Sequence, residues 1–134
     1  MKKFEVSMTH RILVVEDEHV LAENVKTYLA RRSPDVRIAA DGRRAMEMVE
    51  SFTPDVVVLD YGLPGENGLQ FYRELVRHRA RPIGCVMITG YAPENITPHA
   101  NKLGIRHLLC KPFSLAELQQ LVDLSAAEAS AYAH

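Results

Sequence analysis

Two hydrophobic patterns alternate along this chain, five times in succession. Short apolar runs, rich in valine, isoleucine and leucine, indicate buried strands at Arg11–Val15, Val36–Ala40, Asp55–Leu59, Ile83–Ile88 and His107–Cys110. After each run, apolar residues recur every three or four positions, which is the spacing of a helix with one buried face. Strands that alternate with helices in this way predict a parallel sheet with helices on both faces.

Two helix starts can be predicted in more detail. Ser114 and Glu117 form a capping box, in which the serine binds early amide groups and the glutamate reaches back. Before the last strand, Pro93 and Pro98 lie close together, and proline is tolerated in the first turn of a helix but not in its interior. We therefore expect Thr97 to cap a short helix that starts at Pro98 and follows a long loop.

Length and composition narrow the class of protein. The 134 residues are enough for one domain, which we place at 11–127, between an N-terminal extension (1–10) and a C-terminal tail (128–134). The formal net charge of −1 predicts no direct binding to nucleic acid. With neither a signal peptide nor a run of ~20 apolar residues, the sequence predicts a cytoplasmic protein without membrane contact. Both cysteines fall in apolar runs and are expected to be buried thiols.

Polar residues follow four of the predicted strands directly. Asp60 ends the most apolar run, and Glu16-Asp17 follows the first strand. Thr89 and Lys111 follow the fourth and fifth strands. Because open parallel sheets place their chemistry at the carboxyl ends of their strands, we expect these side chains to share one pocket.

Three carboxylates in one pocket require a counter-charge. Two unit charges about 5 Å apart repel by roughly 3 kcal/mol at an effective dielectric constant of 20. Mg²⁺ prefers oxygen ligands, and one such ion would balance three carboxylates and one lysine. A phosphoryl group held in line with an aspartate can form an acyl phosphate, because this transfer depends on positioning and charge cancellation.

These motifs, taken together, carry a resemblance to a known family. In order, they are Ile12-Leu13-Val14-Val15-Glu16-Asp17-Glu18, Asp60-Tyr61-Gly62-Leu63-Pro64-Gly65-Glu66-Asn67-Gly68, Met87-Ile88-Thr89-Gly90 and Lys111-Pro112-Phe113. The chain resembles the receiver domain of bacterial two-component response regulators over about Arg11 to Val122. The resemblance implies a flavodoxin-like, doubly wound (βα)5 fold whose five-stranded parallel sheet has the order 2-1-3-4-5.

The resemblance also implies a metal site. Asp17 corresponds to the direct Mg²⁺ ligand, and Glu16 beside it acts through water. Asp60 corresponds to the phosphoacceptor and shares the metal, and Gly62 offers its backbone carbonyl.

The remaining roles concern the phosphoryl group. By resemblance, Thr89 hydrogen-bonds the phosphoryl group and Lys111 pairs with it, and the peptide bond from Lys111 to Pro112 is cis. The chain departs from the family at Leu108, where many receivers carry an aromatic residue. We expect Tyr91 to shield the acyl phosphate from water, and residues 90–97 with the helix after them to move on phosphorylation.

The partners implied are a sensor histidine kinase or histidine phosphotransfer protein, and a downstream protein. The resemblance also allows a homodimer through the face of the fourth and fifth helices, although no lysine or arginine follows Lys111. Such a switch is no true enzyme, since it catalyses only its own phosphorylation and dephosphorylation.

Two alternatives are weaker. An aspartyl-nucleophile phosphatase or phosphotransferase usually needs a second acid two residues after the nucleophile, where this chain has Gly62. A flavin carrier needs a phosphate-binding loop after the first strand, where Glu16-Asp17-Glu18 would repel the phosphate.

Overall fold

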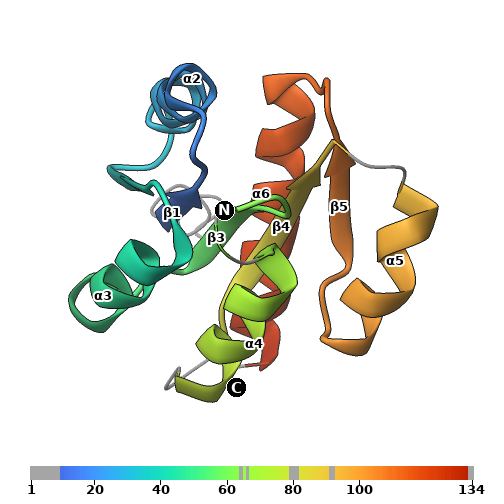
Figure 1. Ribbon diagram of the computed structural model, residues 1–134. Coiled ribbons are helices and arrows are strands. Elements are labelled where there is room, and N and C mark those ends of the chain that lie inside the picture. Colours follow the sequence, from blue (N-terminus) through green and yellow to red (C-terminus); the bar gives the residue numbers. More distant parts are fainter. Residues whose placement is uncertain (1–9, 64, 66, 79–81, 91–92, 133–134) are drawn as a thin grey trace.

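Five parallel strands form a single sheet in the order β2-β1-β3-β4-β5 (Figure 1). In chain order they are β1 (Arg11–Val15), β2 (Asp35–Ala39), β3 (Val56–Asp60), β4 (Gly84–Thr89) and β5 (His107–Cys110). The computed structural model describes residues 10–63, 65, 67–78, 82–90 and 93–132. The predicted flavodoxin-like sheet and its strand order are confirmed.

In the described part of the chain, five helices cover the two faces of this sheet (Figure 1). They are α2 (His19–Leu29), α3 (Gly42–Phe52), α4 (Gly68–His78), α5 (Pro93–Lys102) and α6 (Leu115–Tyr132). One core cluster joins α3, α4 and α5 to the sheet, and a second joins α2 and α6 to the opposite face. The doubly wound arrangement expected from the sequence is therefore present.

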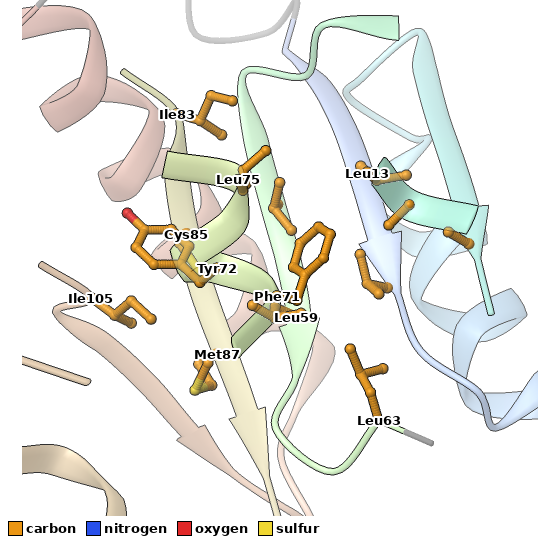
Figure 2. Packing of buried hydrophobic residues seen from close by; sticks show 14 of the residues in the cluster. Leu13, Leu59, Leu63, Phe71, Tyr72, Leu75, Ile83, Cys85, Met87 and Ile105 are labelled. Atoms are coloured by element: carbon orange, nitrogen blue, oxygen red, sulfur yellow. The ribbon is translucent and has the colours of Figure 1, made fainter. Parts of the chain in front are cut away.

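The central strands are apolar because both of their faces are covered. Every residue of β3 is buried, and Val56, Val57 and Leu59 have no exposed surface at all. Figure 2 shows Phe71 of α4 lying over Leu59, with Tyr72 of the same helix near Cys85 of β4. Burying a side chain of this kind contributes about 1.5–3 kcal/mol, so the sheet is a firm support for the residues at its strand ends.

The capping box predicted at Ser114 and Glu117 is confirmed. The N–H of Glu117 donates to Ser114 Oγ at 3.0 Å, and the N–H of Ser114 donates to Glu117 Oε1 at 3.3 Å. This pair fixes the start of α6, the longest helix of the described chain.

The start of the helix before β5 was predicted wrongly. α5 begins at Pro93, soon after β4 ends at Thr89, so Thr97 and Pro98 lie inside the helix. Pro93 also suits the first position of a helix, which the prediction overlooked. Ile96 and Ala100, four residues apart, are both buried, and their packing keeps the helix continuous across Pro98.

The two cysteines differ, which the sequence did not predict. Cys85 is buried in β4, but Cys110 is exposed at the end of β5, and both are free thiols. β5 is an edge strand, so an apolar run there is covered on fewer sides than in the middle of the sheet. None of the described helices is both long and apolar enough to cross a membrane.

Candidate functional site

The strand register brings the predicted site residues to one edge of the sheet. Val15 of β1 pairs with Leu59 of β3, so the residue after each of them, Glu16 and Asp60, lies at the same level. On the other side of β3, Asp60 pairs with Ile88, the residue before Thr89. Residues from three neighbouring strands therefore meet where those strands end.

Three carboxylates converge at this edge. Glu16, Asp17 and Asp60 each offer an oxygen, and these oxygens all lie within 4.8 Å of one another. Glu16 and Asp60 are buried, whereas Asp17 is exposed. The arrangement thus has a closed side against the sheet and an open side toward solvent.

Lys111 completes the cluster from the end of β5. Its Nζ lies 3.4 Å from Asp60 Oδ2 and 3.7 Å from Glu16 Oε1. The N–H of Lys111 donates to the carbonyl of Thr89 at 2.8 Å, which holds the lysine segment against β4. The peptide bond from Lys111 to Pro112 is cis, as the resemblance implied.

The electrostatics of the site follow from burial and crowding. Burial, together with the facing Asp60 carboxyl, raises the pKa of Glu16 to about 8, although the N–H of Glu18 and the charge of Lys111 oppose this. Partial burial lowers the pKa of Lys111, but Asp60, Glu16 and Glu18 outweigh it and raise that pKa above its ordinary value. Among the described residues, Glu16 Oε1 is buried without a hydrogen-bond donor. An additional cation would satisfy this oxygen and relieve the repulsion.

Two glycines shape the backbone around Asp60. The N–H of Gly62 donates to Asp60 Oδ1 at 3.0 Å, which orients the carboxylate. A Cβ on Gly68 would lie 2.7 Å from the carbonyl oxygen of Asp60, a distance that real Cβ atoms do not show. Gly68 is therefore needed for α4 to start directly against the end of β3, and its N–H donates to the carbonyl of Tyr61 at 2.6 Å.

One contributor, Glu18, was given no role at the site from the sequence. Glu18 Oε1 lies 3.4 Å from Lys111 Nζ, although these residues are 93 positions apart. The N–H of Glu18 also donates to Glu16 Oε2 at 3.1 Å. Glu18 belongs to the same acidic run as Glu16 and Asp17, and that adjacency was the one signal that could have placed it here.

Other predicted contributors are only partly tested. The side chain of Thr89 is fully buried at the end of β4, so its contact with a phosphoryl group stays a prediction, as does a metal contact from the Gly62 carbonyl. Leu108 packs partly buried against the core cluster of α3, α4 and α5. Tyr91 lies outside the described residues, as do residues 1–9 of the predicted extension.

Comparisons with known proteins identify the family and the fold of the chain. A family model of the response regulator receiver domain matches residues 12–123. The chain belongs to this family. It is therefore a phosphorylation-dependent signalling domain by family. Receiver domains act in signalling together with histidine kinases or phosphotransfer proteins.

Individual relatives agree with the family match. The transcriptional regulatory protein PdtaR of Mycobacterium tuberculosis is 28% identical over 122 residues, covering 90% of this chain. The match covers 58% of PdtaR, so the chain spans less than two-thirds of the length of this relative.

Solved structures show the same fold. A CheY-like receiver domain protein from Methanospirillum hungatei JF-1 superposes with a TM-score of 0.84 at 22% identity, covering 92% of this chain and 98% of that one. The receiver domain of the Francisella response regulator 1452 gives a TM-score of 0.78 at 24% identity, covering 90% and 98%. At these identities the likeness shows the fold alone.

Proposed function

We propose that Asp60 accepts a phosphoryl group from a phosphohistidine, and that the acyl phosphate changes the affinity of the chain for a downstream protein. The observation that carries the proposal is the convergence of Asp60, Lys111, Glu16 and Asp17 at the end of the central strand. The donor would be a sensor histidine kinase or a histidine phosphotransfer protein, in keeping with the family.

The proposed transfer depends on Asp60, Lys111 and Gly62. A carboxylate oxygen of Asp60 attacks phosphorus while the bond from phosphorus to the donor imidazole breaks, and the imidazole nitrogen leaves with the bonding electrons. Lys111, at 3.4 Å from Asp60 Oδ2, would pair with the phosphoryl oxygens as a mobile point charge. Gly62 holds the other carboxylate oxygen through its N–H, so Asp60 stays aimed during the transfer.

The carboxylates fit a divalent cation. Glu16, Asp17 and Asp60 would hold Mg²⁺, and the buried, unsatisfied Glu16 Oε1 supports this assignment. When bound, this ion neutralises negative charge on the carboxylates and on the phosphoryl oxygens. Asp17, exposed to solvent, marks the side from which the ion would enter.

We infer that the chain acts as a switch and processes no separate substrate. Aspartyl-nucleophile hydrolases place a general acid two residues beyond the nucleophile, and Gly62 stands at that position. Its N–H orients Asp60 but cannot act as a general acid at neutral pH.

Intact-mass measurement after treatment with acetyl phosphate tests the proposal. The wild-type chain should gain one phosphoryl group with Mg²⁺ and none with EDTA. The adduct should disappear in Asp60→Asn and persist in Asp35→Asn, a matched carboxylate change at the opposite end of the sheet. No metal-dependent adduct from acetyl phosphate or a phosphorylated kinase would overturn the proposal.

Lys111 can be tested in the same assay. Lys111→Gln should slow formation of the adduct, because the phosphoryl oxygens lose their cationic partner, whereas Lys102→Gln on α5 should not. Equal rates for both variants would remove Lys111 from the proposed transfer.

A further inference from the structure

A groove separate from the acidic cluster runs between α4 and α5. It encloses about 410 Å³, which lies within the roughly 300–1,000 Å³ typical of ligand clefts. Its apolar part is formed by Leu69 and Leu103 with the ring of Tyr61, all partly buried. Its rim carries Arg73 and Lys102, both exposed.

The two cations of this groove have no partner within the described chain. Among the described lysines and arginines, only Lys26, Arg73 and Lys102 make no ion pair, side-chain hydrogen bond or contact with an aromatic ring. Two of these three line the same groove, and none of the described residues that line it is acidic. The groove therefore presents positive charge that no described residue neutralises.

The other side of α4 shows the opposite charge. The groove between α3 and α4 is lined by Asp41, Glu47, Glu50 and Glu74, with a single arginine. Glu74 follows Arg73 in the chain, but its carboxylate lies 3.5 Å from Arg77 Nη1, away from Arg73. Neighbouring acids thus leave the positive charge between α4 and α5 in place.

We propose that the groove between α4 and α5 binds an acidic segment of a partner protein. Carboxylates of the segment pair with Arg73 and Lys102, while one of its apolar side chains lies against Leu69 and Leu103. Nucleic acid fits less well, because its affinity comes from many phosphate contacts, whereas this groove offers two unpaired cations on a chain of net charge −1. The proposal does not depend on phosphorylation of Asp60, so it can fail or hold independently of that function.

Amide chemical shifts of the full, unphosphorylated chain provide the test. The probes are three synthetic ten-residue peptides: one with glutamates and two leucines, one with lysines in place of glutamates, and one with serines in place of leucines. The glutamate–leucine peptide should produce saturable shifts at Leu69, Arg73, Lys102 and Leu103. The lysine peptide should produce none, and the serine peptide should bind on the order of tenfold more weakly, because the apolar contact is lost.

Charge-reversal variants distinguish binding in this groove from non-specific electrostatic attraction to the chain. Arg73→Glu combined with Lys102→Glu should lower the affinity for the glutamate–leucine peptide on the order of tenfold, since both exposed ion pairs with the peptide are lost. Lys26→Glu is the matched control, because Lys26 is also unpaired but lies on α2. It should leave the affinity unchanged.

Several results would overturn the proposal. These are shifts that fall elsewhere, equal binding to the double variant, equal binding of the serine peptide, or no binding of the acidic peptide. Inorganic phosphate that reproduces the shifts at the same concentration would show that the groove takes small anions only. A single-stranded oligonucleotide that binds these residues more tightly than the peptide would assign the groove to nucleic acid instead.

Discussion

At the carboxyl end of the sheet, Glu16, Glu18 and Asp60 share a single lysine, Lys111, whereas at the amino end Asp123 and Glu128 each have a basic partner of their own. There α6 supplies Asp123, 3.0 Å from Arg32 Nη1, and Glu128, 2.9 Å from His107 Nε2. The same sheet therefore carries unbalanced charge at one end and paired charge at the other.

The charges at the amino end of the sheet stabilise the fold, whereas those at the carboxyl end prepare the site for a ligand. Paired charges at the amino end tie the last helix to β5 and to the turn after α2, and each pair contributes to the folded state. Like charges at the carboxyl end cost folding free energy unless a proton or a cation joins them. The site is thus prepared for a ligand at the expense of the stability of the free protein.

The largest effect expected from this contrast comes from Glu16, which should make the stability of the protein depend on pH. Its pKa of about 8 in the folded chain exceeds its ordinary value of 4.5, so the folded state holds a proton that the unfolded state releases. Between these pH values the metal-free protein should lose stability as pH rises, by up to about 1.4 kcal/mol per pH unit. Urea unfolding at several pH values in EDTA measures this slope.

Two changes should flatten that slope. Glu16→Gln removes the titrating group, and saturating Mg²⁺ favours the ionised carboxylates. Glu47→Gln, an exposed carboxylate on α3, should leave the slope as it is. A wild-type protein whose stability does not fall over this range would contradict the crowded-charge description of the site.

The next effect concerns packing at the amino end. A Cβ on Gly84 would lie 2.7 Å from the backbone oxygen of Ser125, where α6 crosses the start of β4. Gly84→Ala should therefore destabilise the chain by about 1–3 kcal/mol, measured as a lower urea midpoint. Gly90→Ala, with no atom within 4 Å of its Cβ, is the control and should change stability by less than about 0.5 kcal/mol. Equal midpoints for the two variants would show that α6 shifts freely here.

A smaller effect should come from the ion pair at the end of α6. Glu128→Ala should cost about 1 kcal/mol, because half-buried His107 loses its 2.9 Å partner. Glu47→Ala breaks the exposed pair with Arg43 on α3 and should cost no more than about 0.5 kcal/mol. Thermal or urea unfolding at pH 7 compares the two, and an equal loss would mean that the amino-end pair is no more than a surface contact.

The smallest effect should appear at His10, with a sign opposite to that of Glu16. Burial lowers the pKa of His10 below 6.5, and Arg32 acts in the same direction, although Asp123 and Asp55 oppose it. The unfolded chain then binds the proton more readily, so stability should fall as pH drops below about 6.5. His10→Gln should reduce this acid loss, and an unchanged loss in the variant would assign it to other groups.

Most of the fold could be predicted from sequence because its signals are local. The five strands were placed to within one residue, and the capping box at Ser114 and Glu117 was confirmed. Each of these depends on a few neighbouring residues and on whether an apolar run is long enough for a strand. The order of the motifs at the strand ends also identified the family.

The errors lie where distant packing decides. α5 starts at Pro93 because burial of Ile96 and Ala100 outweighs the local cost of Pro98, and Cys110 is exposed because β5 is at the edge of the sheet. The local sequence pattern specifies neither the start of α5 nor the exposure of Cys110, because both depend on which elements of the fold are neighbours.

By itself, the sequence determined the strand and helix pattern, the strand order expected of its family, and the identity of the acids that meet at Asp60. Only the tertiary structure decided which charges are paired. It brought Glu18 to 3.4 Å from Lys111 across 93 positions, joined Glu128 to His107, and left Arg73 and Lys102 without a described partner. The physical reason is that charge interactions depend on separation in space and on burial, which a one-dimensional pattern does not specify.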